Sequence, residues 1–348
     1  MGLFSSENSF LGIDIGGSSL KLVELKKDSN GKIALSTYGF TENIGEINYD
    51  RKSDIKYLAK LINKIQQRAG TSTINAVASL PTFSVFSSII SLSGVNRKNI
   101  VDNINEKAKK VIPLPLEEMV LDWKIIETKQ IANNKNDVKV FLTGSPKKLV
   151  KKYISIFKEA NINLLSLETE TFSLVRSLVG NDKSNMMILE IGANSTDISI
   201  VKNGIPVLNR SIDICGTTIT KAIAEKLNIS FKRAEQFKCD LGVESLSDEE
   251  HSLPKVVKEA VRPIVHEVEY MMDLFQNNYN EQLEKIILSG GGSFLINFSD
   301  YLSHSLNIKV IIGDPWSRVV YPEDLKPVLL EVGPKLSVAI GLAMRGLE

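Results

Sequence analysis

Apolar and polar residues alternate with two different periods along the first eighty residues of the chain. Residues 11–23 place apolar residues in two short runs around a Gly-Gly-Ser-Ser turn, which predicts two antiparallel strands, and residues 31–40 predict a third. Residues 54–69 carry aliphatic side chains at helical spacing, and residues 75–80 form a short buried strand. The predicted order is therefore three strands, a helix and a fourth strand.

A second set of elements interrupts this order. Residues 83–92 and 138–143 predict strands, and residues 98–111 and 146–160 predict helices. Together they predict an inserted α+β subdomain over about residues 82–158.

Two boundaries inside this insertion have local signals. Ser145 and Pro146 are expected to cap the helix that follows them, because proline suits the first turn of a helix. Residues 131–137 are polar and rich in asparagine, and we expect them to form an exposed hairpin loop.

The second half of the chain repeats the strand–turn–strand pattern. Residues 188–200 match the first hairpin in layout and follow a predicted strand at 164–167 and a connecting helix at 169–179. Further along, the pattern predicts one buried strand and four helices, over residues 286–288, 217–227, 231–239, 254–278 and 335–347. Pro263 lies inside the long third helix and is expected to kink it or to mark a join.

Composition and charge fit a two-domain globular protein. The 348 residues are 43% hydrophobic and 24% charged, which is enough for two full cores. A net charge of +1 argues against nucleic acid as the main partner, since phosphate binding needs a concentrated basic surface. The two cysteines have no metal-ligand or disulfide spacing, which fits a reducing cytosol. No run of ~18 apolar residues predicts a membrane helix.

An acidic residue stands just ahead of the turn in both hairpins. Asp14 precedes Gly16-Gly17-Ser18-Ser19, and Glu190 precedes Gly192-Ala193-Asn194-Ser195-Thr196. Small turn residues leave backbone N–H groups free to bind an anion, and the acid can hold its metal ion through water. Either hairpin alone is more often an ordinary β-turn. A third glycine-rich turn at residues 286–293, directly after an apolar run, makes a phosphate-binding role far more specific.

These three elements resemble the phosphate and adenosine motifs of the actin/Hsp70/sugar-kinase ATPase superfamily. Within it the chain is similar to the PilM family, the actin-like cytoplasmic proteins of type IV pilus assembly. The most specific part of the resemblance is the block Pro113-Leu114-Pro115-Leu116-Glu117-Glu118 with Leu121-Asp122-Trp123, and residues 229–238 and 338–346 extend it over nearly the whole chain. The resemblance implies an actin-like (ribonuclease H-like) α/β fold of two domains with an inserted α+β subdomain.

The same resemblance implies units that are not continuous in sequence. The expected units are a first actin-like domain of residues 1–81 and 159–182, an SHS2-like insertion of residues 82–158, and a second actin-like domain of residues 183–334. Residues 216–280 would form the helical subdomain of the second domain, and the final helix, residues 335–347, would pack back on the first.

The resemblance implies a site for ATP with Mg²⁺, in which Asp14 and Glu190 hold the metal ion through water. The residues expected at this site are Asp14, Gly16, Gly17, Ser18, Ser19, Lys21, Glu190, Gly192, Asn194, Ser195, Thr196, Gly216, Glu235, Lys238, Gly290, Gly291, Gly292 and Ser293. Aspartate is usual in the superfamily where Glu190 stands, and the extra methylene displaces the carboxylate by ~1.5 Å. We therefore expect nucleotide binding with slow or no hydrolysis.

Three assignments stay open at this point. Lys21 either faces the phosphates or lies on an exposed strand face. Glu235 and Lys238 either approach the ribose or base, or form a surface ion pair at i,i+3 spacing. The superfamily residue that orients the attacking water corresponds to Glu168 or Glu170, and either one could face the site.

The resemblance also implies a cytoplasmic scaffold held at the inner membrane by a protein partner rather than by lipid. The expected partner is the short N-terminal cytoplasmic tail of a PilN-type inner-membrane protein, with other pilus assembly proteins and a second copy of the chain as further candidates. In that family the tail docks between the insertion and the first domain. Residues 112–123 and 83–90 would line this groove, where an extended peptide can be held by main-chain bonds and side-chain pockets.

Two other functions compete with this one. An FtsA-like division protein would carry a C-terminal amphipathic membrane helix, which we do not expect because the chain ends at Glu348, directly after its last predicted helix. A small-molecule kinase of the same superfamily would need a catalytic base beside a sugar-sized pocket, and the sequence offers no clear candidate for one.

Overall fold

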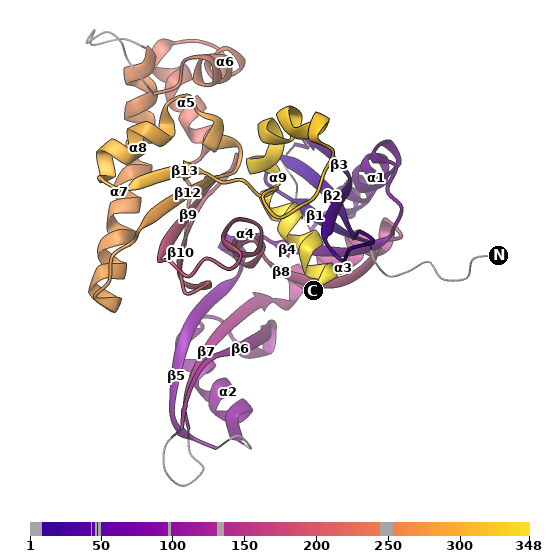
Figure 1. The fold of residues 1–348 in the computed structure, drawn as a ribbon, viewed down its shortest axis with the longest axis vertical. Helices are drawn as coiled ribbons and strands as arrows, with labels where there is room; N and C mark the ends of the chain where they lie inside the picture. Colours follow the sequence, from indigo (N-terminus) through magenta and orange to yellow (C-terminus); the bar gives the residue numbers. More distant parts are fainter. Residues whose placement is uncertain are drawn as a thin grey trace, which may run out of the picture.

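Three β-sheets organise the chain. The computed structural model describes residues 9–42, 44–45, 47, 50–96, 99–130, 136–243 and 253–348. Two five-stranded sheets lie beside each other, and a three-stranded sheet extends away from both (Figure 1). The short helix α4 (Glu170–Leu174) lies where the three sheets approach one another, and it continues as one π-helical turn, Val175–Val179.

The first five-stranded sheet has the order β3-β2-β1-β4-β8. Its strands are β1 (Ser9–Ile15), β2 (Ser19–Lys27), β3 (Ile33–Glu42), β4 (Asn75–Leu80) and β8 (Asn163–Thr169). The helices that cover it are α1 (Lys52–Ala69), α3 (Lys147–Glu159) and α9 (Lys326–Leu347). Successive strand residues point to opposite faces, so Leu22 packs with α1 and α3, whereas Val23 packs with α9. This sheet is therefore covered on both faces.

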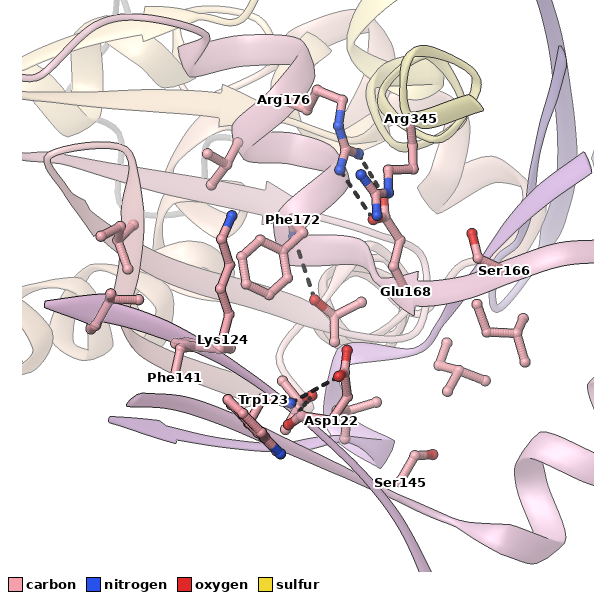
Figure 2. A pocket seen from close by; sticks show the side chains of 18 of the residues that line it. Asp122, Trp123, Lys124, Phe141, Ser145, Ser166, Glu168, Phe172, Arg176 and Arg345 are labelled. Carbon is pink, nitrogen blue, oxygen red and sulfur yellow. Dashed lines mark hydrogen bonds and ion pairs between the residues drawn. The ribbon is translucent and has the colours of Figure 1, made fainter. Parts of the chain in front are cut away.

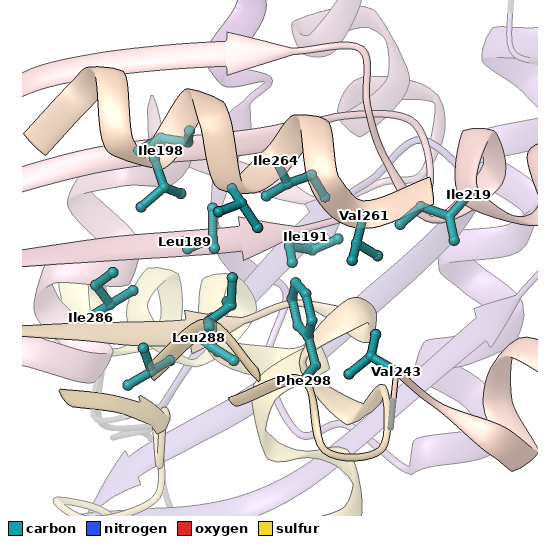
Figure 3. Packing of buried hydrophobic residues seen from close by; sticks show 14 of the residues in the cluster. Leu189, Ile191, Ile198, Ile219, Val243, Val261, Ile264, Ile286, Leu288 and Phe298 are labelled. Atoms are coloured by element: carbon teal, nitrogen blue, oxygen red, sulfur yellow. The ribbon is translucent and has the colours of Figure 1, made fainter. Parts of the chain in front are cut away.

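The second five-stranded sheet has the order β11-β10-β9-β12-β13. Its strands are β9 (Met186–Ile191), β10 (Thr196–Lys202), β11 (Ile205–Ile212), β12 (Lys285–Ser289) and β13 (Lys309–Ile312). The helices that follow its strands are α5 (Gly216–Leu227), α6 (Phe231–Leu241), α7 (Leu253–Tyr279) and α8 (Phe298–Leu306). Figure 3 shows Leu189 and Ile191 of β9 in one apolar cluster with Ile264 of α7 and Phe298 of α8.

The three-stranded sheet forms the insertion, in the order β5-β7-β6. Its elements are β5 (Phe86–Val95), α2 (Ile100–Val111), β6 (Met119–Gln130) and β7 (Asn136–Pro146). Ile104 and Ala108 of α2 fill one face of this sheet. Since β6 is an outer strand of this sheet and β8 an outer strand of the first, two strand edges are left without a paired strand among the described residues.

Two segments pack elsewhere than the sequence predicts. Residues 147–158 are predicted to belong to the insertion, but Tyr153 and Phe157 of α3 lie in the core of the first sheet. Residues up to 334 are predicted to belong to the second domain, but Trp316 and Leu329 pack with β2 of the first sheet. Helical periodicity and burial reveal that a segment has an apolar face, and they do not reveal which sheet covers that face. The domain limits themselves stay a prediction.

The predicted cap of α3 is right for Pro146 and wrong for Ser145. The helix begins at Lys147 with Pro146 as its N-cap residue, and no side chain makes a capping hydrogen bond. The hydroxyl of Ser145 is buried and has no hydrogen-bond partner among the described residues. Both residues belong to the end of β7, where successive side chains point to opposite faces of the sheet, so neither is placed as a side-chain cap of the helix.

Other predicted boundaries of helices and strands differ less from the structure. α7 runs unbroken through Pro263, so this proline does not mark a join. α9 begins at Lys326, earlier than the predicted residue 335. Of the predicted hairpin loop at 131–137, residues 131–135 lie outside the described residues, and the last two are the start of β7. Strands β6, β11 and β13 have no counterpart in the prediction.

One helical stretch of the described chain, Glu323–Leu347, is long and apolar enough by length and composition to cross a membrane. However, 67% of its most apolar window is buried inside the fold, and α9 packs on β1 and β2. These properties are also those of a core helix.

Candidate functional site

The two hairpins predicted to bind phosphate have the same register. In the first, β1 pairs with β2 so that Asp14 lies opposite Lys21. In the second, β9 pairs with β10 so that Glu190 lies opposite Asp197. The turns are closed alike, by hydrogen bonds from the amide of Gly16 to the carbonyl of Ser19 (2.9 Å) and from the amide of Gly192 to the carbonyl of Ser195 (2.9 Å). The two acids therefore occupy corresponding places.

Asp14 is held by two partners. Lys21 donates from Nζ to its Oδ2 at 2.8 Å, and Ser79 of β4 donates from Oγ to its Oδ1 at 3.3 Å. Burial lowers the pKa of Lys21, but the ion pair with Asp14 outweighs burial, so the pKa lies above its ordinary value. Lys21 thus lies on the site side of its strand, where its charge is neutralised by Asp14.

Glu190 has an acidic neighbour where Asp14 has a lysine. Its removal from water, followed by the charge of Asp197, raises the pKa of Glu190 to about 8, although Lys21 opposes the shift. Burial also raises the pKa of Asp197, whose Oδ2 accepts a hydrogen bond from Ser195 Oγ at 3.0 Å. The second hairpin therefore brings together two acids that do not both ionise easily.

The predicted turns meet one another. Asn194 donates from Nδ2 to the carbonyl of Gly17 at 2.9 Å, which joins the two hairpins. A Cβ on Gly17 would come within 2.6 Å of that nitrogen, so the close approach requires glycine. In the third turn, a Cβ on Gly290 would lie 2.5 Å from the carbonyl oxygen of Ile191, and Gly290 has φ +76°. A Cβ on Gly292 would lie 2.4 Å from the Ile191 side chain.

The remaining predicted turn residues differ in their solvent exposure. Ser18 and Ser19 are half-buried at the first turn, and Gly291 is exposed. The Ser293 hydroxyl is buried and donates to the carbonyl of Gly290 at 2.7 Å, so it is already engaged inside the turn. Thr196 Oγ1 is buried and has no hydrogen-bond partner in the described part of the chain.

Lys238 lies beside the second hairpin rather than in a plain surface ion pair. Its Nζ donates to the carbonyl of Gly216 at 3.1 Å, to Thr220 Oγ1 at 2.9 Å and to Glu235 Oε2 at 2.8 Å. The amide of Gly216 in turn donates to the carbonyl of Gly192 at 3.0 Å. Helices α5 and α6 are therefore fixed to the turn that follows Glu190.

The structure separates the roles of Glu168 and Glu170. Glu168 faces away from the hairpins and forms a two-pronged ion pair with Arg176 at 2.6 and 3.1 Å. Loss of surrounding water raises the pKa of Glu170 well above its ordinary value, and the charges of Asp14 and Glu190 raise it further. Glu170 is thus the acid that faces the site.

Asp197 was not predicted from the sequence as a site residue, and the sequence left open whether Glu168 or Glu170 faces the site. Asp197 could have been found from the hairpin register, because a four-residue turn places it opposite Glu190. Glu170 has no comparable local signal, since its hydrogen-bond partner Thr82 lies 88 positions away.

A divalent metal ion fits these residues only through water. Within the described ranges, no three His, Cys, Asp or Glu side chains form a group that could hold a metal ion directly. The acids nevertheless gather around Asp14 and Glu190, and Asp197 Oδ1 is buried without a hydrogen-bond partner from the described residues. An oxygen-rich, negatively charged site of this kind suits a hydrated Mg²⁺.

A separate pocket of about 740 Å³ lies between the insertion and the first sheet. Its walls include residues of the two outer strands, β6 and β8, together with residues of β7, α4 and α9. Val120 and Ile125 of β6 line it and are 43% and 42% exposed. Figure 2 shows Phe172 of α4 above Trp123 of β6, with the Lys124 side chain extending up beside the Phe172 ring.

The lining of this pocket corrects part of the prediction. Of residues 83–90, only Val85 lines it, because β5 is the opposite outer strand of the insertion. Of residues 112–123, the strand residues Val120, Asp122 and Trp123 line it, and the Pro-Leu-Pro-Leu segment does not.

A match to a protein-family model decides the family. The model described as "Type IV pilus assembly protein PilM" matches residues 12–347. The chain belongs to the PilM family. Its predicted membership is thereby confirmed.

Solved structures confirm the predicted fold. The "PilM-PilN type IV pilus biogenesis complex" is similar with a TM-score of 0.83 and 23% identity, covering 97% of this chain and 98% of that one. MreB5 of Spiroplasma citri bound to AMPPNP has a TM-score of 0.55 and 12% identity, covering 97% and 95%. The PilM-family chain therefore has the actin-like fold.

Cell division protein FtsA is a more distant relative. FtsA of Bacillus subtilis (strain 168) is 21% identical over 256 residues, which is 67% of this chain and 58% of that protein. The chain thus spans little more than half the length of this relative. The family match, and not this one, covers nearly the whole chain.

Proposed function

We propose that this PilM-family chain is an ATP-binding scaffold of type IV pilus assembly that binds the N-terminal cytoplasmic tail of a PilN-type inner-membrane protein. The observation that carries the proposal is the pocket between β6 and β8 in a chain of this family. The similar solved structure is named for a PilM-PilN complex. The scaffold would be cytoplasmic and would reach the inner membrane through this partner. Other pilus assembly proteins and a second copy of the chain are further candidate partners.

The nucleotide would lie between the three glycine turns. Asp14 and Glu190 would hold Mg²⁺ through water, and the amides of Gly16, Gly17 and Gly192 would face the phosphates. Mg²⁺ would supply positive charge against the phosphate oxygens. Lys238 and Glu235 would lie on the ribose and base side, next to Gly216. The neighbour MreB5, solved with AMPPNP, shares this fold.

Hydrolysis would be slow. Both hydrogen bonds that Glu170 accepts from Thr82 go to Oε2, so one oxygen of the acid that faces the site is already engaged and less free to orient the attacking water. We expect turnover well below the ~10 s⁻¹ that is typical of enzymes. Several turnovers per second by the isolated protein, measured as phosphate release, would contradict a scaffold role.

The tail would lie in the pocket as an extended chain. Outer strands offer unpaired backbone groups, and an extended peptide can bind by pairing with such an edge while its side chains enter adjacent pockets. The pocket is lined by side chains of both charges. The basic ones are Lys124, Arg176 and Arg345, and the acidic ones are Asp122, Glu168 and Glu348. A charged tail would therefore find partners for groups of either sign.

Calorimetry with the synthetic tail peptide tests the partner. We expect micromolar or tighter binding, which corresponds to about −8 kcal/mol. Ile125→Asp should weaken it at least tenfold, because a carboxylate would enter the apolar wall. Val101→Asp is the matched control: Val101 is 49% exposed on α2 and does not line the pocket. Equal losses in both variants, or binding to protein-free liposomes without peptide binding, would reject the proposal.

A further inference from the structure

Helix α4 contributes to both sites described above. Glu170, its first residue, faces the acids of the two hairpins, while Phe172 lines the pocket. The Phe172 ring meets the Phe141 ring of β7 edge to face, with 5.1 Å between their centres and 77° between their planes. Two residues on one helical turn therefore connect the candidate nucleotide site with the wall of the insertion.

Thr82 forms the second connection. Its backbone amide and its hydroxyl both donate to Oε2 of Glu170, at 2.8 and 2.9 Å. Thr82 follows β4 and begins the short 3₁₀ helix η1 (Thr82–Ser84) that leads into β5. Leu80 and Val85, on either side of it, both line the pocket. Each end of the Thr82–Glu170 contact thus belongs to a segment that also forms the pocket wall.

The surroundings of α4 leave little room to absorb a displacement. A Cβ on Gly341 of α9 would lie 2.0 Å from the carbonyl oxygen of Ser173, so the two helices touch through their backbones. Leu174 is buried against β9 and α9, and Thr171 Oγ1 lies 3.4 Å from Ser199 Oγ of β10. Closely packed elements move as units rather than deform locally.

We infer that the Thr82–Glu170 contact couples the pocket to the nucleotide site, so that tail peptide and nucleotide each strengthen the binding of the other. The inference rests on the proposed function for the identity of both ligands. Thr82 is in this sense a positioning residue for Glu170.

The direction of the coupling follows from charge. Glu170 shares the site with three other acids, Asp14, Glu190 and Asp197, whose negative charges repel its own. A hydrated Mg²⁺ brought with the nucleotide would relieve this repulsion. With that repulsion relieved, Glu170 would stay in the position from which it accepts both hydrogen bonds of Thr82, so Thr82 would be held more firmly. Leu80, Val85 and Phe172 would then be fixed in place before the peptide arrives, and a preorganised wall lowers the ordering cost of binding.

The test measures linkage in the full-length protein by calorimetry. The tail peptide is titrated with and without saturating Mg²⁺-AMPPNP, and Mg²⁺-AMPPNP is titrated with and without saturating peptide. We expect each ligand to tighten the other by the same factor, about fivefold or more. Thermodynamic linkage requires the two factors to be equal, so each titration is an independent check on the other.

Three variants assign the coupling to this contact. Thr82→Val keeps the branched shape and the backbone amide but removes the hydroxyl donor, and should lose most of the factor while the peptide still binds without nucleotide. Thr82→Ser keeps the hydroxyl and should retain the factor. Glu170→Gln keeps an acceptor but removes the ionisable charge, and should bring the factor close to one.

The outcomes separate this inference from the proposed function. If both ligands bind the wild-type protein and the factor is one, or if Thr82→Val keeps the wild-type factor, the coupling through Thr82 is refuted and the proposed function stands. If the peptide or the nucleotide fails to bind the wild-type protein at all, the proposed function fails and the coupling fails with it.

Discussion

The two hairpins of the candidate site share turn length and register but differ at the position opposite the acid. Lys21 faces Asp14 in the first, and Asp197 faces Glu190 in the second. In the first hairpin the opposing charges form a 2.8 Å ion pair. In the second, burial and the neighbouring acid raise the pKa of Glu190 to about 8. The same backbone thus gives one acid a counter-charge and leaves the other to keep a proton near neutral pH.

Because of this difference, we expect the two acids to contribute unequally to metal affinity. An acid that is ion-paired to a lysine can exchange that partner for a metal ion, whereas an acid that holds a proton must first release it. We therefore expect Asp14 to contribute more than Glu190 to Mg²⁺-ATP affinity at pH 7.

Removing the carboxylate of the first hairpin should have the largest effect. Asp14→Ala is expected to weaken Mg²⁺-ATP binding by ~1–3 kcal/mol, the range for a lost charge-assisted contact, or about 5- to 150-fold. Glu190→Gln is the matched variant, since glutamine resembles a protonated glutamate, and it should lose less at pH 7. Unchanged calorimetric affinity of Asp14→Ala would remove Asp14 from the site, and equal losses would remove the distinction between the hairpins.

Changing the opposing residues should move the titration of Glu190 in opposite directions. Asp197→Asn removes the neighbouring negative charge and should lower the pKa of Glu190 below about 8. Lys21→Met removes the positive charge that opposes the shift, and should raise that pKa. Carbon-13 NMR of the glutamate carboxyl groups measures both. A shift in the same direction in the two variants is incompatible with the charge arrangement described above.

The second hairpin should also make stability depend on pH. The pKa of Glu190 is about 8 in the folded state against an ordinary value of 4.5, so its proton is bound more tightly in the folded state. The resulting stabilisation is complete below pH 4.5 and is lost as pH rises to about 8. Urea unfolding at pH 5, 7 and 8 should show this decline, and Glu190→Gln should flatten it. Parallel curves for the two proteins would show that Glu190 does not titrate in this range.

Giving the second hairpin an aspartate, as in the first, should have the smallest effect of these changes, and the effect should be on ATP turnover. Glu190→Asp shortens the side chain by one methylene and restores the residue that is usual in the superfamily. We expect a few-fold rise in ATP turnover, because the carboxylate returns by ~1.5 Å to the position that suits water placement. Phosphate release under single-turnover conditions measures it, and a fall in rate would count against the geometric account of slow hydrolysis.

Local sequence patterns were sufficient to predict the two hairpins. They were insufficient to predict which other elements pack against them. Alternation of apolar residues and the glycine turns predicted β1, β2, β9 and β10, since each hairpin is formed by neighbouring residues. The fold followed from the resemblance that these motifs carry. The place of α3 could not be predicted, because its apolar face would suit either the insertion or the first sheet. The orientation of Glu170 could not be predicted either. Its hydrogen-bond partner Thr82, and Phe141, which contacts Phe172 of the same helix, are distant in sequence and come close only when the chain folds.

The glycine at position 12 of β1 has a consequence for the order in which the protein forms. A Cβ there would lie 1.8 Å from the carbonyl oxygen of Ala339, so α9 rests directly on a strand that is made long before it. At about 5–20 residues added per second, the ribosome delivers α9 on the order of tens of seconds after β1. During synthesis, the apolar face that includes Val23 and Leu25 stays uncovered until this helix has been made. The nascent chain therefore exposes that face until α9 has been made, so the first sheet cannot complete its core while the chain up to α9 is being synthesised.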